Sequence, residues 1–127
     1  DRVEIFMARD RDLKEYYGFE IDPLGRVLDY SASYYRQYKR DWTCAEMETA
    51  ATITETGYIV EGSLPMKMIR NITDTDILRA GIFRGEFHYG DKSDIIQHWI
   101  SWVDPATEIP DFHVPTAFGA FKFIELQ

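Results

Sequence analysis

The chain has 127 residues, of which 45% are hydrophobic and 15% aromatic, so it can form one domain with a packed core and is not intrinsically disordered. Its formal charge of −8 repels nucleic-acid phosphates and anionic lipid surfaces, which argues against both as partners. The apolar runs are too short to span a bilayer, and the single cysteine, Cys44, excludes an internal disulfide.

Alternating apolar and polar residues predict β-strands along most of the chain. In residues 1–7, for example, Val3 and Ile5 share one face, whereas Arg2 and Glu4 share the other. Turn residues or polar loops separate the predicted strands, which cover residues 1–7, 16–22, 26–30, 79–89, 98–103 and 118–126.

Residues 47–65 show the clearest pattern. They alternate, turn at 55–57 and alternate again, which predicts a β-hairpin, with Gly57 expected to take a positive φ. Pro65 suits the first turn of a short helix over residues 66–72. A hairpin alone is marginally stable, so the other strands are expected to form a sheet that supports it.

The segment 31–44 has no regular period and predicts a long ordered loop, a common location for binding residues. The complete pattern predicts a single all-β domain, an antiparallel β-sandwich with one or two short helices.

Five short motifs follow one another in an order that resembles the family 9 carbohydrate-binding modules. They are DRVEIF at 1–6, YGFE at 17–20, GYIVE at 57–61, ISWVDP at 100–105 and PTAFG at 115–119. The resemblance covers essentially the whole chain and implies a jelly-roll-like β-sandwich.

The same resemblance implies a non-catalytic accessory module that binds a mono- or oligosaccharide, such as the ends of plant polysaccharides. It implies an extracellular or periplasmic location and, as partner, the catalytic domain of a fused polysaccharide-degrading enzyme. Members have further strands before the first motif, so the chain is expected to be the C-terminal portion of such a module, truncated on its N-terminal side. An exposed sheet edge would then favour a homodimer.

Site residues follow from the positions that match the family motifs. Glu4 matches the family's acidic ligand, Glu20 replaces a basic contact, and Arg84 aligns with a polar residue after the short helix. One tryptophan of the family's sugar clamp would precede the first residue. The other aligns with Phe112, and His113 is a possible substitute.

Strand parity predicts that Glu4, Glu20 and Arg84 share one sheet face, where carboxylates and a guanidinium can bind vicinal hydroxyls. The alternative is a solvated ladder of ion pairs. Phe112 is then either a stacking platform or a core aromatic, and Trp102 is either a weaker site candidate or structural.

Hydrolysis by Glu4 and Glu20 is disfavoured, because an intervening Arg84 would keep both carboxylates ionised and deprive the reaction of its general acid. The predicted protein is therefore not an enzyme.

Three aspartate pairs leave structural calcium open as a cofactor, with solvated acidic turns as the alternative. They are Asp10 with Asp12, Asp74 with Asp76, and Asp91 with Asp94. Two further functions stay open. One is haem binding, known in the same sandwich superfamily, for which Met7, Met66, Met68 and the three histidines are candidate axial ligands. The other is a structural domain without a ligand.

Overall fold

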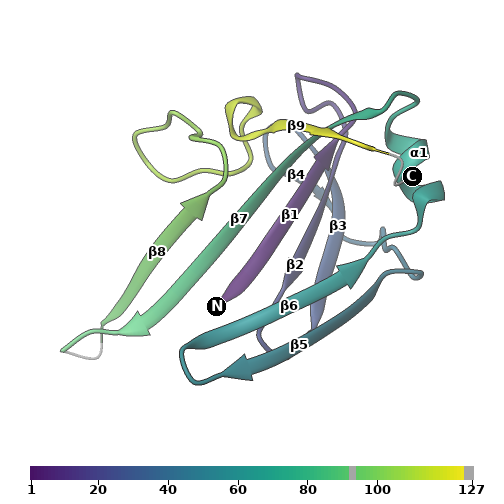
Figure 1. The fold of residues 1–127 in the computed structure, drawn as a ribbon. Coiled ribbons are helices and arrows are strands. Elements are labelled where there is room, and N and C mark those ends of the chain that lie inside the picture. The colour runs from purple at the N-terminus through teal and green to yellow at the C-terminus, as the bar shows by residue number, and fades with distance from the viewer. Residues whose placement is uncertain (92–93, 125–127) are drawn as a thin grey trace.

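The structure is a computed structural model that describes residues 1–91 and 94–124. Within these residues the chain forms an antiparallel β-sandwich with one short α-helix and one 3₁₀ helix (Figure 1). Its elements in chain order are β1 (Arg2–Ala8), β2 (Tyr16–Ile21), β3 (Val27–Ser33), β4 (Gln37–Lys39), β5 (Glu48–Thr54), β6 (Gly57–Ser63), α1 (Met66–Ile72), β7 (Ile77–Tyr89), β8 (Ile95–Ser101), η1 (Pro115–Ala117) and β9 (Gly119–Lys122).

The first layer is a seven-stranded sheet in the order β4-β3-β2-β1-β7-β8, with β9 paired to β7. β7 is its longest strand, with 13 residues. β1 pairs with one edge of β7, and β8 and β9 share the other edge, β8 along residues 83–89 and β9 along residues 77–80. The loop between β8 and β9 therefore connects two strands that both pair with β7.

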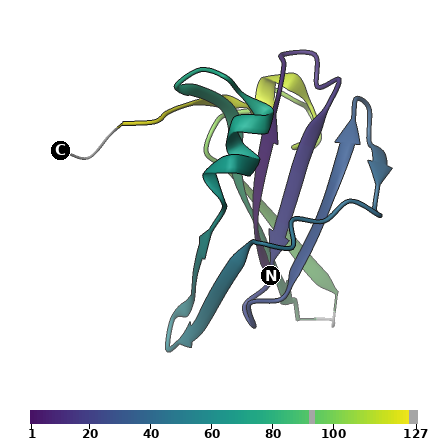
Figure 2. The same ribbon diagram turned by 90° about the vertical axis from the view of Figure 1, so that its right-hand side faces the viewer.

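The second layer is the β5–β6 hairpin, and α1 lies on the same side of the sheet (Figure 2). The predicted hairpin and the predicted helix over residues 66–72 are both confirmed. Gly25, in the turn before β3, has a positive φ of 78°, but Gly57 does not, so the expectation for Gly57 is wrong. No helix in the described part of the chain has the length and apolar character needed to cross a membrane.

The large sheet buries residues on both of its faces, because each face is covered. We call the face that carries Arg2, Glu4 and Phe6 the cavity face, and the opposite face, which carries Val3 and Met7, the hairpin face. On the cavity face, Phe6 packs against Phe83 under the loop that joins β8 to β9. The core of the hairpin face contains Met7, Phe19, Ile69, Ile72, Leu78 and Ala80.

The largest differences between the predicted and observed boundaries lie in three places. The predicted loop 31–44 contains the end of β3 and all of β4, which has three exposed residues and is too short to show a period. β8 begins at Ile95 and ends at Ser101, so it lies three residues earlier than predicted at its start. The final strand, predicted over residues 118–126, is β9, and residues 125–126 lie outside the described residues.

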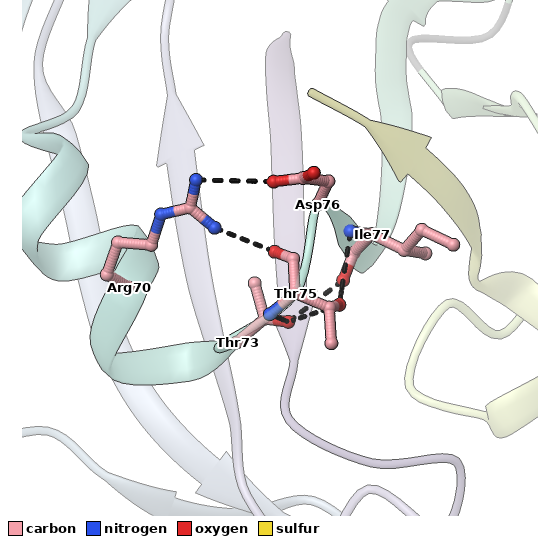
Figure 3. Close-up of polar contacts among 5 residues, drawn as sticks. All are labelled: Arg70, Thr73, Thr75, Asp76 and Ile77. Atoms are coloured by element: carbon pink, nitrogen blue, oxygen red, sulfur yellow. Dashed lines mark hydrogen bonds and ion pairs between the residues drawn. The ribbon is translucent and has the colours of Figure 1, made fainter. Parts of the chain in front are cut away.

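The turn from α1 into β7 is held by polar contacts (Figure 3). Arg70 donates to the carbonyl of Thr75 at 2.8 Å and pairs with the Asp76 carboxylate at 3.4 Å. The Thr73 hydroxyl donates to the carbonyl of Ile77 at 2.9 Å. These contacts fix the direction in which β7 leaves the helix.

Candidate functional site

A cavity of about 170 Å³ opens on the cavity face, beside the loop that joins β8 to β9. The sheet contributes its floor, and two loops contribute its rim. The lining residues are Arg2, Glu4 and Trp99 from strands, and Arg36, Pro110, Phe112 and His113 from loops. We call this hollow the first cavity.

The floor is organised by Arg2 and two carboxylates. Glu4 and Glu20 are direct neighbours across β1 and β2. The Nε of Arg2 donates to Oε1 of Glu4 at 2.6 Å and lies 3.0 Å from Oε2 of Glu20. The Tyr30 hydroxyl donates to the other oxygen of Glu20 at 3.2 Å. Burial, and then the charge of Glu20, raises the pKa of Glu4, and Arg2 opposes this rise.

Aromatic rings form the wall next to Arg2. The guanidinium carbon lies 5.5 Å from the Trp99 ring and 5.8 Å from the Phe87 ring. Phe112 meets Trp99 edge to face, with 5.6 Å between the ring centroids. Gly85 faces Arg2 across the strands, and a Cβ there would lie 3.1 Å from Trp99, so a glycine makes room for these rings.

His113 anchors the rim loop to the large sheet. Its side chain is buried, with 8% of the residue exposed. Nδ1 lies 2.9 Å from the Tyr16 hydroxyl, and Nε2 lies 3.3 Å from the Tyr38 hydroxyl. Burial, and then the nearby charge of Arg36, lowers the pKa of His113 to about 4. The imidazole is therefore neutral at pH 7, with one ring nitrogen donating and the other accepting.

Arg36 and Asp111 join the two loops across the rim. Arg36 donates to the Asp111 carboxylate at 2.8 Å, the Tyr35 hydroxyl donates to its second oxygen, and the His113 N–H donates at 2.9 Å. Burial acts to raise the pKa of Asp111, but these hydrogen bonds and the charge of Arg36 hold it below its usual value. Arg36 has a positive φ of 56°, an uncommon backbone conformation for a residue other than glycine.

The structure brings together three of the predicted site residues. Glu4, Phe112 and His113 line the first cavity, and Glu20 is linked to it through Arg2. The Glu4 side chain is only 3% exposed, so it is not part of a solvated ladder of ion pairs. Phe112 is buried and stacks on Phe83 with 4.2 Å between centroids, so it is a core aromatic that also lines the first cavity.

The prediction that Arg84 shares a sheet face with Glu4 and Glu20 is wrong. Arg84 lies opposite Val3 in the β1–β7 register, which places it on the hairpin face. There its guanidinium lies 4.8 Å from the centre of the Tyr58 ring.

Trp102 also lies on the hairpin face. Its ring centroid is 4.9 Å from that of Phe121, and the residue is 51% exposed. Arg84 and Trp102 are thus separated from the other four predicted site residues by the sheet. The binding roles of all six residues stay predictions.

Four residues of the first cavity were not among the predicted site residues: Arg2, Arg36, Trp99 and Pro110. Arg2 has the same strand parity as Glu4, so the pattern already placed the two together. Trp99 and Trp102 differ in strand parity, but nothing in the strand pattern indicated which face held the site. Arg36 had no local signal, because its position depends on contacts with a loop 75 residues further along the chain.

Two of the three aspartate pairs considered for calcium have a member that makes other contacts. Asp10 accepts hydrogen bonds from the backbone N–H groups of Asp12 and Lys14, and Asp76 pairs with Arg70. Across residues 1–91 and 94–124, no group of three or more His, Cys, Asp or Glu side chains is placed to hold a metal ion. Structural calcium stays a prediction.

Two of the residues proposed as haem ligands are already engaged. Both ring nitrogens of His113 lie within hydrogen-bond distance of tyrosine hydroxyls, and Met7 is buried in the core of the hairpin face. These contacts do not favour the haem alternative.

Comparisons with known proteins agree with the fold. The chain superposes on the crystal structure of a "putative carbohydrate-binding protein" from Bacteroides uniformis ATCC 8492 with a TM-score of 0.67 and 20% sequence identity. The match covers 97% of this chain and 61% of that one, so the chain spans less than two thirds of that structure's length. No curated protein matches the sequence significantly. A sequence profile of the carbohydrate family 9 binding domain-like family matches residues 1–126, and the chain therefore belongs to this family.

Proposed function

We propose that the protein binds carbohydrate in the first cavity without transforming it. The observation that carries this proposal is the composition of the cavity wall, which combines a carboxylate, two guanidinium groups and the Trp99 ring within about 170 Å³. Carboxylate oxygens accept hydrogen bonds from sugar hydroxyls, and guanidinium groups donate to them. An indole ring covers the apolar C–H face of a pyranose.

The contacts of the two carboxylates favour binding over hydrolysis. A glycosidase needs one carboxyl group as acid and a second that is free to activate water or attack the sugar. The raised pKa of Glu4 would suit an acid, but Arg2, and not Arg84 as predicted, lies between Glu4 and Glu20 and contacts both. Glu20 also accepts from Tyr30. The shared guanidinium favours two ionised carboxylates that accept hydrogen bonds over an acid and base pair.

The biological setting of the proposal is supported by family membership alone. We propose a mono- or oligosaccharide ligand, such as a plant polysaccharide end, and a role as an accessory module of a larger secreted protein. A fused catalytic domain and a second copy of the chain are the proposed protein partners.

A matched pair of tryptophan variants tests the site. Trp99→Ala removes a ring from the wall of the first cavity, whereas Trp102→Ala removes one from the opposite face of the sheet. Isothermal titration against a panel of mono- and oligosaccharides is expected to show about a tenfold or greater loss of affinity for Trp99→Ala and less than about a twofold change for Trp102→Ala.

Thermal unfolding followed by circular dichroism confirms that each variant is folded before titration. Equal losses in the two variants would place the site elsewhere. Folded wild-type protein that gives no heat with any sugar of the panel would contradict carbohydrate binding itself.

A further inference from the structure

Two histidines stack on each other near the turn that joins β7 to β8. His88 in β7 and His98 in β8 have ring centroids 5.2 Å apart and ring planes inclined by only 10°. Glu86 lies opposite His98 and Ile96 lies opposite His88, so the two histidines are diagonal neighbours on one face of the sheet. This is the hairpin face, because Glu86 has the same parity in β7 as Arg84.

Both imidazoles are accessible to a ligand from solvent. His88 and His98 are exposed. Within residues 1–91 and 94–124 neither ring takes part in a hydrogen bond or an ion pair. His113 differs, since both of its ring nitrogens lie within hydrogen-bond distance of tyrosine hydroxyls. A neutral imidazole whose acceptor nitrogen is not engaged can donate that lone pair to a metal ion.

The separation of the two rings suits two ligands of one ion. A metal–nitrogen bond of about 2.0–2.1 Å requires the two coordinating nitrogens to lie within roughly 4.2 Å of each other. Rings with centroids 5.2 Å apart can reach this separation by rotation about side-chain torsions alone. The rotation tilts the rings out of their parallel stack, because the nitrogen lone pair lies in the plane of the ring. Exposure of both side chains leaves room for this tilt.

The charges that surround the histidines are one carboxylate and one guanidinium. Glu86, directly opposite His98, has a side chain that is 43% exposed, and Arg84 pairs with it at 3.4 Å. The net charge of −8 on the chain favours the approach of a cation. In the described part of the chain no third His, Cys, Asp or Glu joins the two rings in a metal-binding group, so water completes the coordination of an ion held there.

We propose that His88 and His98 together bind one divalent transition-metal ion, which bridges β7 and β8. Imidazole nitrogens favour Cu²⁺, Ni²⁺ and Zn²⁺ over Ca²⁺ and Mg²⁺, which prefer oxygen ligands, and Cu²⁺ is expected to bind most tightly. Among the described strands β8 is the last of the large sheet and pairs with β7, so the ion reinforces the attachment of an edge strand. The sheet separates this site from the first cavity, and the proposal does not depend on carbohydrate binding.

Calorimetric titration of protein without a polyhistidine tag, with CuCl₂ and with ZnCl₂, tests the site. One ion per chain is expected. His88→Ala and His98→Ala should each weaken binding about tenfold or more, because a single imidazole cannot chelate the ion. Gln97→Ala is the matched control, since Gln97 is an exposed residue of β8 whose side chain lies on the other face, and it should change affinity less than about twofold.

Thermal unfolding distinguishes a bridge between strands from loose binding to the surface. An ion that links β7 to β8 requires the folded protein, so Zn²⁺ in excess of its dissociation constant should raise Tm by several degrees, and EDTA should reverse the rise. The rise should be absent in both histidine variants. Wild-type protein that binds neither ion, or that binds both as tightly after either histidine is replaced, would overturn the proposal and leave carbohydrate binding unaffected.

Discussion

His113 shows how one side chain joins the core to the site. Its buried ring lies between the hydroxyls of Tyr16 in β2 and Tyr38 in β4, and 4.8 Å from the ring centroid of Phe6. The surrounding charges come from Arg36, Asp111 and Arg2. A proton on this imidazole would be a buried positive charge with little compensation, which burial disfavours.

The low pKa of His113 predicts that acid destabilises the protein. From pH 6.5, the ordinary pKa of histidine, down to about 4, its pKa in the folded protein, the unfolded chain binds a proton that the folded protein does not. The free energy of unfolding should therefore fall with pH across this window, by up to about 3 kcal/mol from this group. Urea unfolding at several pH values measures the fall.

His113→Gln is the control for this prediction, because glutamine retains hydrogen-bonding groups but does not titrate. Glu4, whose raised pKa acts with the opposite sign, is present in both proteins and cancels in the comparison. The stability of the variant should depend less steeply on pH between 4 and 6.5. Parallel curves for the two proteins would show that His113 contributes nothing to the pH dependence.

The candidate residues differ in how far sequence could locate them. Glu4 was found from a motif whose strand also carries Arg2, because neighbours at i and i+2 on a strand share a face. The face of Arg84 could not be found this way. Parity sorts residues within one strand, but both faces of this sheet are buried, so polar positions in β1 and β7 do not identify a common face.

The hairpin and the sheet are joined by a contact that the strand pattern did not predict. The Arg84 guanidinium of β7 packs on the Tyr58 ring of β6. Neither the Nε of Arg84 nor the Tyr58 hydroxyl has a hydrogen-bond partner among the described residues. The packing of cation on ring, rather than hydrogen bonding, is the interaction between the two side chains here.

Arg84→Ala is expected to lower the free energy of unfolding by about 1 kcal/mol, since it removes one partly exposed cation–π contact and the packing of the long side chain. Sugar affinity should change less than about twofold, because Arg84 lies on the hairpin face. Urea unfolding and titration calorimetry measure the two effects.

Arg11→Ala, at an exposed arginine in the loop before β2, is the matched control and should leave stability nearly unchanged. If Arg84→Ala abolished sugar binding while preserving stability, the role first predicted for Arg84 would be restored and the assignment of the site to the cavity face would be wrong.

Strand positions were largely predictable, since most strands have one side more buried than the other along part of their length. The β5–β6 hairpin followed from its alternation and central turn. β4 escaped prediction because three exposed residues carry no periodic signal, and its pairing with β3 depends on the chain reversal at residues 34–36.

At the scale of the whole molecule, β1 couples the two cores. Phe6 belongs to the core of the cavity face and Met7, the next residue, to the core of the hairpin face. Because β1 is paired on both sides, with β2 and with β7, neither core can separate without disrupting the centre of the sheet.

Because of this coupling, we expect a single unfolding transition. A destabilising substitution in either core should lower its midpoint. Phe6→Leu on the cavity face and Phe19→Leu on the hairpin face should each lower the midpoint of the same transition. Each should lower the free energy of unfolding by roughly 1–2 kcal/mol. Far-UV circular dichroism and tryptophan fluorescence should give coincident curves in wild-type protein and in both variants. Separate midpoints for the two probes would show that the layers unfold independently.

The shared edge of β7 has a consequence for how recognition can diversify. Because β8 and β9 both pair with that edge, the segment between them is anchored at each end to one continuous strand. Insertions and exchanges in residues 103–109 can then reshape the rim without altering strand order, while Asp111, Phe112 and His113 keep the segment attached to the rest of the fold. The fold thus separates the part of the chain that must be retained from the part that selection, or a protein engineer, is free to vary.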